Sequence, residues 1–229
     1  MLVTFSGIDG AGKSTQIQLL IDYLRQEGQE PIYVWARGGY TPMFEGLKAL
    51  LRRFAKHLVP PPGDNPQRER AFRRGWIRRL WLTFALLDLL WMYGVKLRWW
   101  QWCGRTVVCD RYLWDTLVDF RLYFPQERVE CWWLWRLLVH LTPQPDAAFL
   151  LIVPVEESMR RSSIKGDPFR EPLEMLAQRL AQYQAIAQGR QWHIVDGCQP
   201  VSELAAQIVK VVQDVVTPAI ARNAHGRET

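Results

Sequence analysis

A glycine-rich loop near the amino terminus constrains the fold more than any other feature of this sequence. Gly7–Ser14 reads GIDGAGKS, which matches the pattern GxxxxGK[S/T] in full. Leu2–Phe5 before it is apolar, and apolar residues recur at helical spacing over Lys13–Arg25 behind it. A loop between a strand and a helix in this order predicts a phosphate-binding loop, because its backbone N–H groups and the helix amino terminus then face one anion.

The loop predicts a site for ATP and Mg²⁺ with separate roles for its residues. Lys13 would meet the β- and γ-phosphates, and the Ser14 hydroxyl would ligate Mg²⁺. The residues expected to contact ATP are Gly7, Ile8, Asp9, Gly10, Ala11, Gly12, Lys13, Ser14 and Thr15.

Short apolar runs alternate with helical patterns along the rest of the chain. Strands are expected at Leu2–Phe5, Pro31–Trp35, Thr106–Cys109, Ala147–Val153 and Trp192–Val195. Helices are expected at Lys13–Arg25, Phe44–Leu58, a long stretch ending near Trp102, Leu113–Leu122, Glu130–Leu141, a start at Val155–Arg161, Leu173–Ala187 and Val201–Val216. This alternation predicts an α/β fold with a parallel sheet covered on both faces.

Length and composition set the class of protein. The chain has 229 residues, of which 48% are apolar and 23% charged, so we expect one globular domain over residues 1–216 and a flexible tail at 217–229. The four cysteines form no CxxC pair and no zinc-site spacing, and no signal-peptide pattern opens the chain. These features predict a cytoplasmic protein. The net charge of +6 fits nucleic-acid binding and phosphate-handling enzymes alike.

A carboxylate at the end of another apolar strand completes the expected catalytic set. Thr106–Cys109 is followed directly by Asp110, which is where an enzyme with a phosphate-binding loop holds an acidic group beside Mg²⁺. We therefore expect Ser14 and Asp110 at the metal.

Several segments together resemble the thymidylate kinase family. They are Phe5–Gln16, the Asp110-Arg111-Tyr112 triplet, Pro145-Asp146 before a strand, the arginines from Arg160 to Arg170, and Val195–Pro200 before the last helix. Taken in order, these segments span nearly the whole chain. The resemblance implies a three-layer P-loop NTPase fold with a five-stranded parallel sheet, a lid at about residues 162–172, and transfer of phosphate from ATP to a nucleoside monophosphate, with dTMP the best named acceptor.

The resemblance also implies individual roles. Asp110 would lie at the metal and phosphates, and Arg111 would reach the acceptor phosphate. Lid cations would clamp the transferring charge, because this phosphate-binding loop has Gly10-Ala11 and no arginine. Lys13, Asp110, Arg161 and Arg170 are the expected catalytic residues; Ser163 stands where a further lid arginine is expected, and a solvated basic loop is the rival interpretation. The expected acceptor site comprises Asp9, Arg37, Phe84, Asp88, Arg111, Tyr112 and Asp115.

The acceptor site departs from the family pattern. Arg37 is shifted in register, Asp88 stands where an arginine is expected, and Asp115 and Asp119 replace residues of the segment after the triplet. A carboxylate near a phosphate dianion opposes binding. Asp88, Asp115 and Asp119 would instead bind hydroxyls or an amine of the acceptor, or they would cap helices or pair with arginines. The departures predict weak use of dTMP and keep two alternatives open: a kinase for an unphosphorylated or non-nucleotide acceptor, and a nucleotide-binding regulatory protein with little turnover.

A tryptophan-rich segment at residues 76–102 stands apart from these motifs. Its apolar part, Trp81–Val95, is shorter than a bilayer span, contains Asp88 and is flanked by basic residues. Core packing or a homodimer face is favoured over contact with a membrane surface, because the corresponding family helix packs in a dimer interface. The expected partners are thus ATP, a small acceptor and a second copy of the chain, without nucleic acid.

Overall fold

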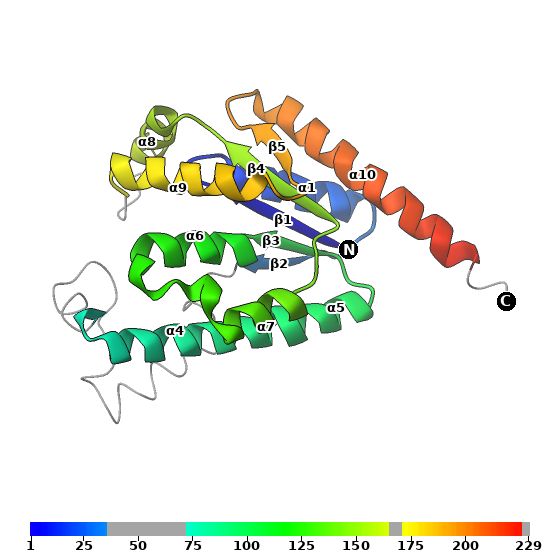
Figure 1. The fold of residues 1–229 in the computed structure, drawn as a ribbon. Helices are drawn as coiled ribbons and strands as arrows, with labels where there is room; N and C mark the ends of the chain where they lie inside the picture. The colour runs from blue at the N-terminus through cyan, green and yellow to red at the C-terminus, as the bar shows by residue number, and fades with distance from the viewer. Residues whose placement is uncertain (36–71, 165–170, 226–229) are drawn as a thin grey trace, which may run out of the picture.

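Five strands form a single parallel sheet in the order β2-β3-β1-β4-β5 (Figure 1). The computed structural model describes residues 1–35, 72–164 and 171–225, with side chains described as far as residue 215. The strands are β1 Leu2–Gly7, β2 Ile32–Trp35, β3 Val107–Asp110, β4 Ala147–Ile152 and β5 His193–Asp196. The expected α/β fold with a five-stranded parallel sheet is confirmed.

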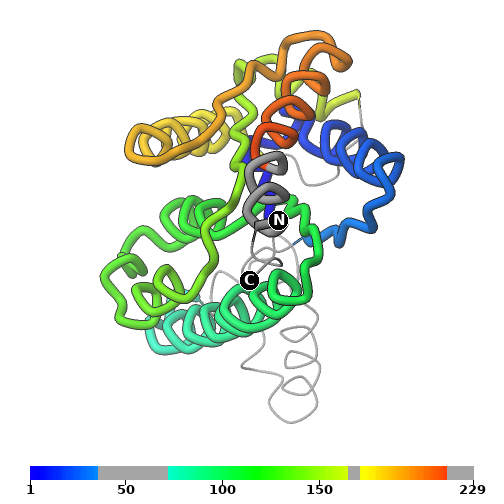
Figure 2. Tube along the Cα trace, turned by 90° about the vertical axis from the view of Figure 1, so that its right-hand side faces the viewer, coloured from blue at the N-terminus to red at the C-terminus, as the bar shows by residue number. Residues whose placement is uncertain are grey.

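Helices cover the sheet on both faces. Figure 2 places α1 and α9 on opposite sides of the molecule, with α6 and α7 on the side of α9. The central strands β1 and β3 are therefore buried along their whole length, which is why their sequences read as continuous apolar runs. The helices are α1 Lys13–Gln26, α4 Gly75–Leu89, α5 Arg98–Trp102, α6 Leu113–Tyr123, α7 Trp133–Leu141, α8 Val155–Ile164, α9 Leu173–Ala187 and α10 Val201–His225, with the π-helix η2 Leu90–Leu97 and the 3₁₀ turns η3 Pro125–Glu127 and η4 Val129–Cys131.

Three expected helix limits differ from the structure. The helix expected from Glu130 begins at Trp133, because η3 and η4 occupy the preceding residues and Arg128 between them adopts a left-handed backbone (φ 42°). Helix α8 continues to Ile164, past the expected loop start at Ser162. Helix α10 runs to His225 instead of Val216. The expected helix at residues 44–58 and the proline-rich loop at 59–67 lie outside the described residues.

The tryptophan-rich segment forms one long helix. Elements α4, η2 and α5 follow one another without a break from Gly75 to Trp102, 28 residues, and this is the one helix of the described residues long and apolar enough to cross a membrane. The expected long helix ending near Trp102 is confirmed, and it extends beyond the apolar part Trp81–Val95 because the flanking basic residues lie inside it. One face of this helix packs into the core through Leu82, Leu86, Leu89 and Tyr93.

The strand register brings the predicted site residues to one edge of the sheet. Phe5 of β1 pairs with Asp110 of β3, and Gly7 pairs with Leu151 of β4. Because parallel strands all end at the same edge, the loop after β1 and the carboxylate at the end of β3 lie side by side.

Candidate active site

The loop after β1 folds into a compact turn that only glycine permits at its two sharpest positions. Gly10 and Gly12 have φ angles of 76° and 94°, in the left-handed region. A Cβ atom on Gly10 would lie 2.7 Å from the backbone oxygen of Ser158, so α8 packs directly against the loop. The Ser158 hydroxyl donates a hydrogen bond of 2.5 Å to the Asp9 carbonyl, which fixes this contact.

Lys13 lies beneath the loop with its ammonium almost fully enclosed. Its Nζ donates hydrogen bonds to the carbonyl oxygens of Gly7 (2.9 Å) and Ile8 (2.8 Å), and the residue is 7% exposed. Burial, followed by the positive charge of Arg111, lowers the pKa of Lys13 to about 8. Among the described residues no carboxylate hydrogen-bonds to this ammonium, and a bound polyanion would stabilise its charged form.

Asp110 presents one carboxylate oxygen to this space. Its Oδ2 accepts a hydrogen bond from the Tyr33 hydroxyl (3.3 Å), while its Oδ1 is buried and has no hydrogen-bond partner in the part of the chain that the structure describes. Burial, and secondly the charge of Asp110, raises the pKa of Tyr33 to about 12. An oxygen of this kind suits a hard cation such as Mg²⁺, with the exposed Ser14 at the start of α1 as a further oxygen ligand.

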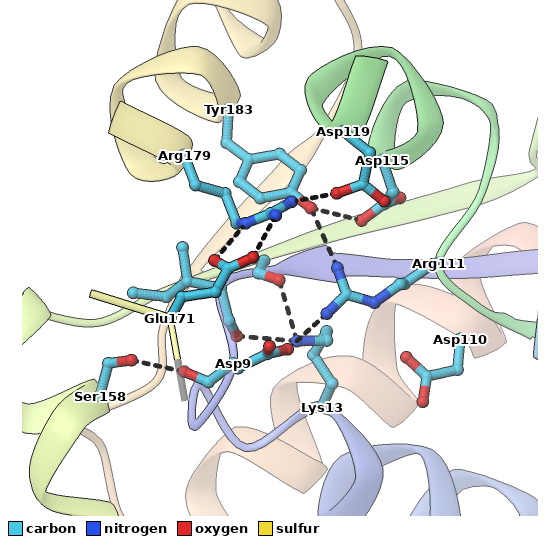
Figure 3. A network of polar contacts seen from close by, with 12 residues as sticks. Asp9, Lys13, Asp110, Arg111, Asp115, Asp119, Ser158, Glu171, Arg179 and Tyr183 are labelled. Atoms are coloured by element: carbon cyan, nitrogen blue, oxygen red, sulfur yellow. Dashed lines mark hydrogen bonds and ion pairs between the residues drawn. The ribbon is translucent and has the colours of Figure 1, made fainter. Parts of the chain in front are cut away.

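Arg111 turns its guanidinium back toward the loop. It adopts a left-handed backbone (φ 71°), uncommon for a residue with a side chain, and forms an ion pair with Asp9 (Figure 3). Its Nη1 also donates to the Tyr183 hydroxyl at 3.5 Å. Burial opposes the charge of the guanidinium, but Tyr183, Asp9 and Asp115 outweigh it and raise the pKa of Arg111.

Asp115 connects β1, α6 and α9 from a fully buried position. One carboxylate oxygen accepts hydrogen bonds from the Ser6 hydroxyl (2.6 Å) and the Tyr112 backbone N–H (2.8 Å), and the other accepts from the Tyr183 hydroxyl (2.7 Å). Burial raises the pKa of this carboxyl, against the opposing effect of Arg111 and of these hydrogen bonds. Asp115 therefore acts here as a helix cap and a junction inside the fold.

A second buried cation lies behind this junction. Arg179 of α9, 1% exposed, donates to Asp119 at 2.5 Å and to both carboxylate oxygens of Glu171 at 2.5 and 2.8 Å (Figure 3). Tyr123 donates a further hydrogen bond of 2.7 Å to Glu171. Burial opposes the charge of the Arg179 guanidinium, but the carboxylates of Glu171 and Asp119 outweigh it and raise the pKa of Arg179. Arg179 thus joins α6, α9 and the residue that follows segment 165–170.

Helix α8 brings another arginine to the phosphate-binding loop. Arg161 Nη1 donates to the carbonyl oxygens of Gly197 (2.9 Å) and Gly10 (3.4 Å), and its Nε donates to Glu157 (2.6 Å). Gly197 approaches the loop closely: a Cβ atom there would lie 2.7 Å from the Ala11 carbonyl oxygen. The loop is therefore held between α8 and the segment after β5.

Comparisons with known proteins agree with this geometry. A family model described as thymidylate kinase matches residues 99–208. A thymidylate kinase of Chlorobium luteolum is 48% identical over 64 residues, 28% of this chain and 29% of that protein. Two longer matches have lower identity. A probable thymidylate kinase of Pyrococcus abyssi is 26% identical over 92% of this chain and 95% of that protein. A thymidylate kinase of Desulfotalea psychrophila is 28% identical over 95% of this chain and 96% of that protein. This chain is therefore similar to thymidylate kinases over nearly all of its length.

Most of the site residues expected from the thymidylate kinase resemblance converge at the end of β1. Lys13, Asp9, Arg111 and Asp115 form one connected group, and Asp110 and Arg161 border it. Three other expected acceptor residues lie in the interior or on α4. Tyr112 is buried, and its hydroxyl donates to the Pro143 carbonyl (2.8 Å). Phe84 and Asp88 lie on α4, where Asp88 is 2% exposed. Arg37 and Arg170 fall outside the described residues.

Sequence reasoning missed several residues of this thymidylate kinase-like site. The structure adds Ser6, Tyr33, Ser158, Arg179 and Tyr183, which contact the expected residues; of these, only Ser6 lies in a segment recognised from the sequence, Phe5–Gln16. The four-residue spacing of Arg179 and Tyr183, which places both on one face of α9, was a usable signal. The other three lie within β1, β2 and α8, and nothing in those elements marked them as site residues.

Proposed function

We propose that this chain transfers the γ-phosphoryl group of ATP to dTMP. The observation that carries the proposal is a complete phosphate-binding loop with an enclosed lysine beside a strand-end carboxylate, in a chain that is similar to thymidylate kinases. Phosphoryl transfer depends on positioning and on neutralising the transferring charge, and does not need a covalent intermediate on the protein. Lys13, Asp110 and the arginines of the site would supply those two functions.

Lys13 would replace its hydrogen bonds to the Gly7 and Ile8 carbonyls with hydrogen bonds to phosphate oxygens. The ammonium lies 2.9 and 2.8 Å from those carbonyls and is shielded from solvent, so its attraction for a phosphate is little weakened by water. Binding of a polyanion would raise the lowered pKa of Lys13 and keep the side chain charged during transfer. Gly7 to Thr15 would supply the backbone donors around the phosphates.

Magnesium would bind between Ser14 and Asp110. The ion would neutralise and orient the phosphate oxygens of ATP. The buried Asp110 Oδ1, which accepts no hydrogen bond from the described residues, fits such a ligand. Tyr33 would hold the other carboxylate oxygen in place through its hydroxyl.

Arg111 and Asp9 would bind the acceptor, with Arg111 on its phosphate and Asp9 near its sugar. Their mutual ion pair occupies these groups while no substrate is bound, so acceptor binding would replace one charged contact with another. Arg37, Phe84, Asp88, Tyr112 and Asp115 remain expected members of this site. Because Asp88 replaces an expected arginine, dTMP should be used less efficiently than by ordinary members of the family.

Arg161 and Arg170 would clamp the transferring phosphoryl group. Arg161 supports this role by its position, since its guanidinium donates to the carbonyl of Gly10 in the loop. A cation here would stabilise charge that develops in the transition state. We also propose a homodimer and a cytoplasmic location; light scattering of the purified protein and cell fractionation test them.

The experiment is a steady-state assay of ADP formation with MgATP and a panel of nucleoside monophosphates and free nucleosides. We expect dTMP to be the preferred acceptor and Lys13→Ala to lower kcat more than ten-fold, a loss above about 1.4 kcal/mol. Lys210→Ala, which removes an exposed lysine from α10, is the matched control and should change nothing. Turnover of Lys13→Ala at wild-type rate, or no turnover of dTMP, refutes the proposal.

A further inference from the structure

The backbone of Arg111 is held on both sides of its left-handed turn. Its own N–H donates to the Phe5 carbonyl of β1 (2.9 Å), and the N–H of the next residue, Tyr112, donates to Asp115 (2.8 Å). The backbone is therefore fixed to β1 and to the start of α6, and the direction of the guanidinium is set by the side chains that contact it.

Two of those side chains, Asp9 and Tyr183, differ in their freedom to move. The guanidinium of Arg111 lies between them, with Nη2 paired to Asp9 and Nη1 donating to the Tyr183 hydroxyl at 3.5 Å (Figure 3). The Asp9 side chain is 39% exposed, whereas Tyr183 is fully buried on α9. An arriving anion can therefore displace Asp9 toward solvent, while Tyr183 stays in place.

The Tyr183 hydroxyl is oriented by Asp115. It donates its hydrogen to this carboxylate at 2.7 Å, so its oxygen faces Arg111 as a hydrogen-bond acceptor. The Ser6 hydroxyl on β1 donates to the other oxygen of the same carboxylate (2.6 Å) and fixes it in turn. Burial, and secondly the charge of Asp115, raises the pKa of Tyr183 well above its ordinary value, so the hydroxyl stays neutral.

A neutral partner leaves the charge of Arg111 available to a ligand. A carboxylate in direct contact neutralises a guanidinium and competes with phosphate for it, whereas a hydroxyl orients it without an opposite charge. Asp115 lies one hydrogen bond farther away, behind the Tyr183 hydroxyl. The charge of Arg111 also lowers the pKa of Lys13, so the two cations act on the same space.

We propose that Tyr183 is a positioning residue, which holds the Arg111 guanidinium where the phosphate of the acceptor binds, with Asp115 fixing the Tyr183 hydroxyl. The inference rests on the proposed function, in which Arg111 binds the phosphate of a nucleoside monophosphate. When the acceptor arrives, its phosphate replaces Asp9 at the guanidinium, and the contact with Tyr183 is retained. Tyr183 does not touch the acceptor and acts through Arg111.

A structural role is the competing explanation, because Tyr183 also packs in the hydrophobic core. Loss of a structural contact would weaken the binding of every acceptor-like ligand, whereas loss of positioning weakens only the contact with phosphate. Thymidine, which lacks the phosphate of dTMP, therefore separates the two roles.

The test is isothermal titration of the full chain with dTMP and with thymidine. Tyr183→Phe should raise the Kd for dTMP about ten-fold, which is about 1.4 kcal/mol, and should change the Kd for thymidine less than about two-fold. In the steady-state assay the same variant should raise KM for dTMP and leave KM for ATP unchanged. The matched control is Tyr23→Phe on α1, which removes a hydroxyl that accepts from Gln213 (2.8 Å) and should change none of these values.

A double-mutant cycle shows whether Tyr183 acts through Arg111. In an Arg111→Met background, Tyr183→Phe should cause no further loss of dTMP binding, because the side chain that it positions is gone. Additive losses would overturn the inference. If Arg111→Met does not fold, the comparison of dTMP with thymidine in Tyr183→Phe decides alone.

The outcomes separate this inference from the proposed function. If wild type phosphorylates dTMP and Tyr183→Phe keeps the full preference for dTMP over thymidine, or loses both ligands equally, the inference alone is refuted. If wild type prefers another nucleoside monophosphate, the assignment of dTMP fails, and the same comparison is made with that nucleotide and its nucleoside. Equal binding of nucleotide and nucleoside by wild type would remove the role of Arg111 and would overturn the inference with it.

Discussion

Replacing Arg179 with methionine should destabilise the protein strongly. The guanidinium is 1% exposed and contacts Asp119 at 2.5 Å and Glu171 at 2.5 and 2.8 Å. Methionine fills a similar volume but leaves both carboxylates without their buried cation. The side chains of Asp119 and Glu171 are 9% and 11% exposed, so water can hydrate them only in part.

The expected loss follows from the cost of breaking a buried ion pair. Removing one partner of a buried ion pair costs about 3–5 kcal/mol, whereas replacing the whole cluster by apolar residues is often neutral. Arg179→Met should therefore lower the free energy of unfolding by about 3 kcal/mol or more. Combining it with Asp119→Leu and Glu171→Leu should recover most of that loss.

Urea unfolding followed by far-ultraviolet circular dichroism measures both effects. The matched control is Arg25→Met, because Arg25 pairs with Asp22 at 3.5 Å with 57% of its side chain exposed, and it should cost less than about 0.5 kcal/mol. A loss below about 1 kcal/mol for Arg179→Met, or no recovery in the triple variant, would refute the argument that this cluster is held by desolvated charge.

Three further predictions concern the site. Because burial lowers the pKa of Lys13 to about 8, the free enzyme loses this charge as pH rises, so kcat/KM for ATP should fall above about pH 8; a flat profile to pH 9.5 would contradict this. Gly197→Ala should cost about 1–3 kcal/mol in thermal unfolding, because the new methyl group would lie 2.7 Å from the Ala11 carbonyl oxygen; Gly189→Ala, whose methyl group meets nothing within 4 Å, is the control. Asp110→Asn should weaken Mg²⁺-dependent turnover far more than metal-free ATP binding, and equal losses would place the metal elsewhere.

The sequence predicted the parts of the fold that repeat a local pattern. Five strands and their parallel arrangement followed from alternating apolar runs, and Lys13 and Asp110 were placed together because parallel strands end at one edge of the sheet. The long helix ending at Trp102 was predicted as well, because its apolar residues recur at helical spacing.

Contacts between distant residues could not be predicted in the same way. Arg179 and Asp119 are separated by 60 residues, and no local periodicity relates them. For Asp115 the sequence left an acceptor contact and a helix cap open, but it did not indicate the hydrogen bonds that the carboxylate accepts from Ser6 and Tyr183. Because Asp115 is buried, its carboxylate accepts hydrogen bonds from the donors that the fold brings close to it.

The position of β1 also has a consequence for synthesis on the ribosome. β1 is translated before both of its partner strands, yet it lies in the centre of the sheet, and these partners begin at Val107 and Ala147. At a synthesis rate of about 5–20 residues per second, the nascent chain waits roughly 5–20 s before the first of these partners exists. During that time Leu2–Gly7 is an apolar segment without its partner strands, so the loop that we propose binds phosphate depends on this part of the chain staying free of aggregation.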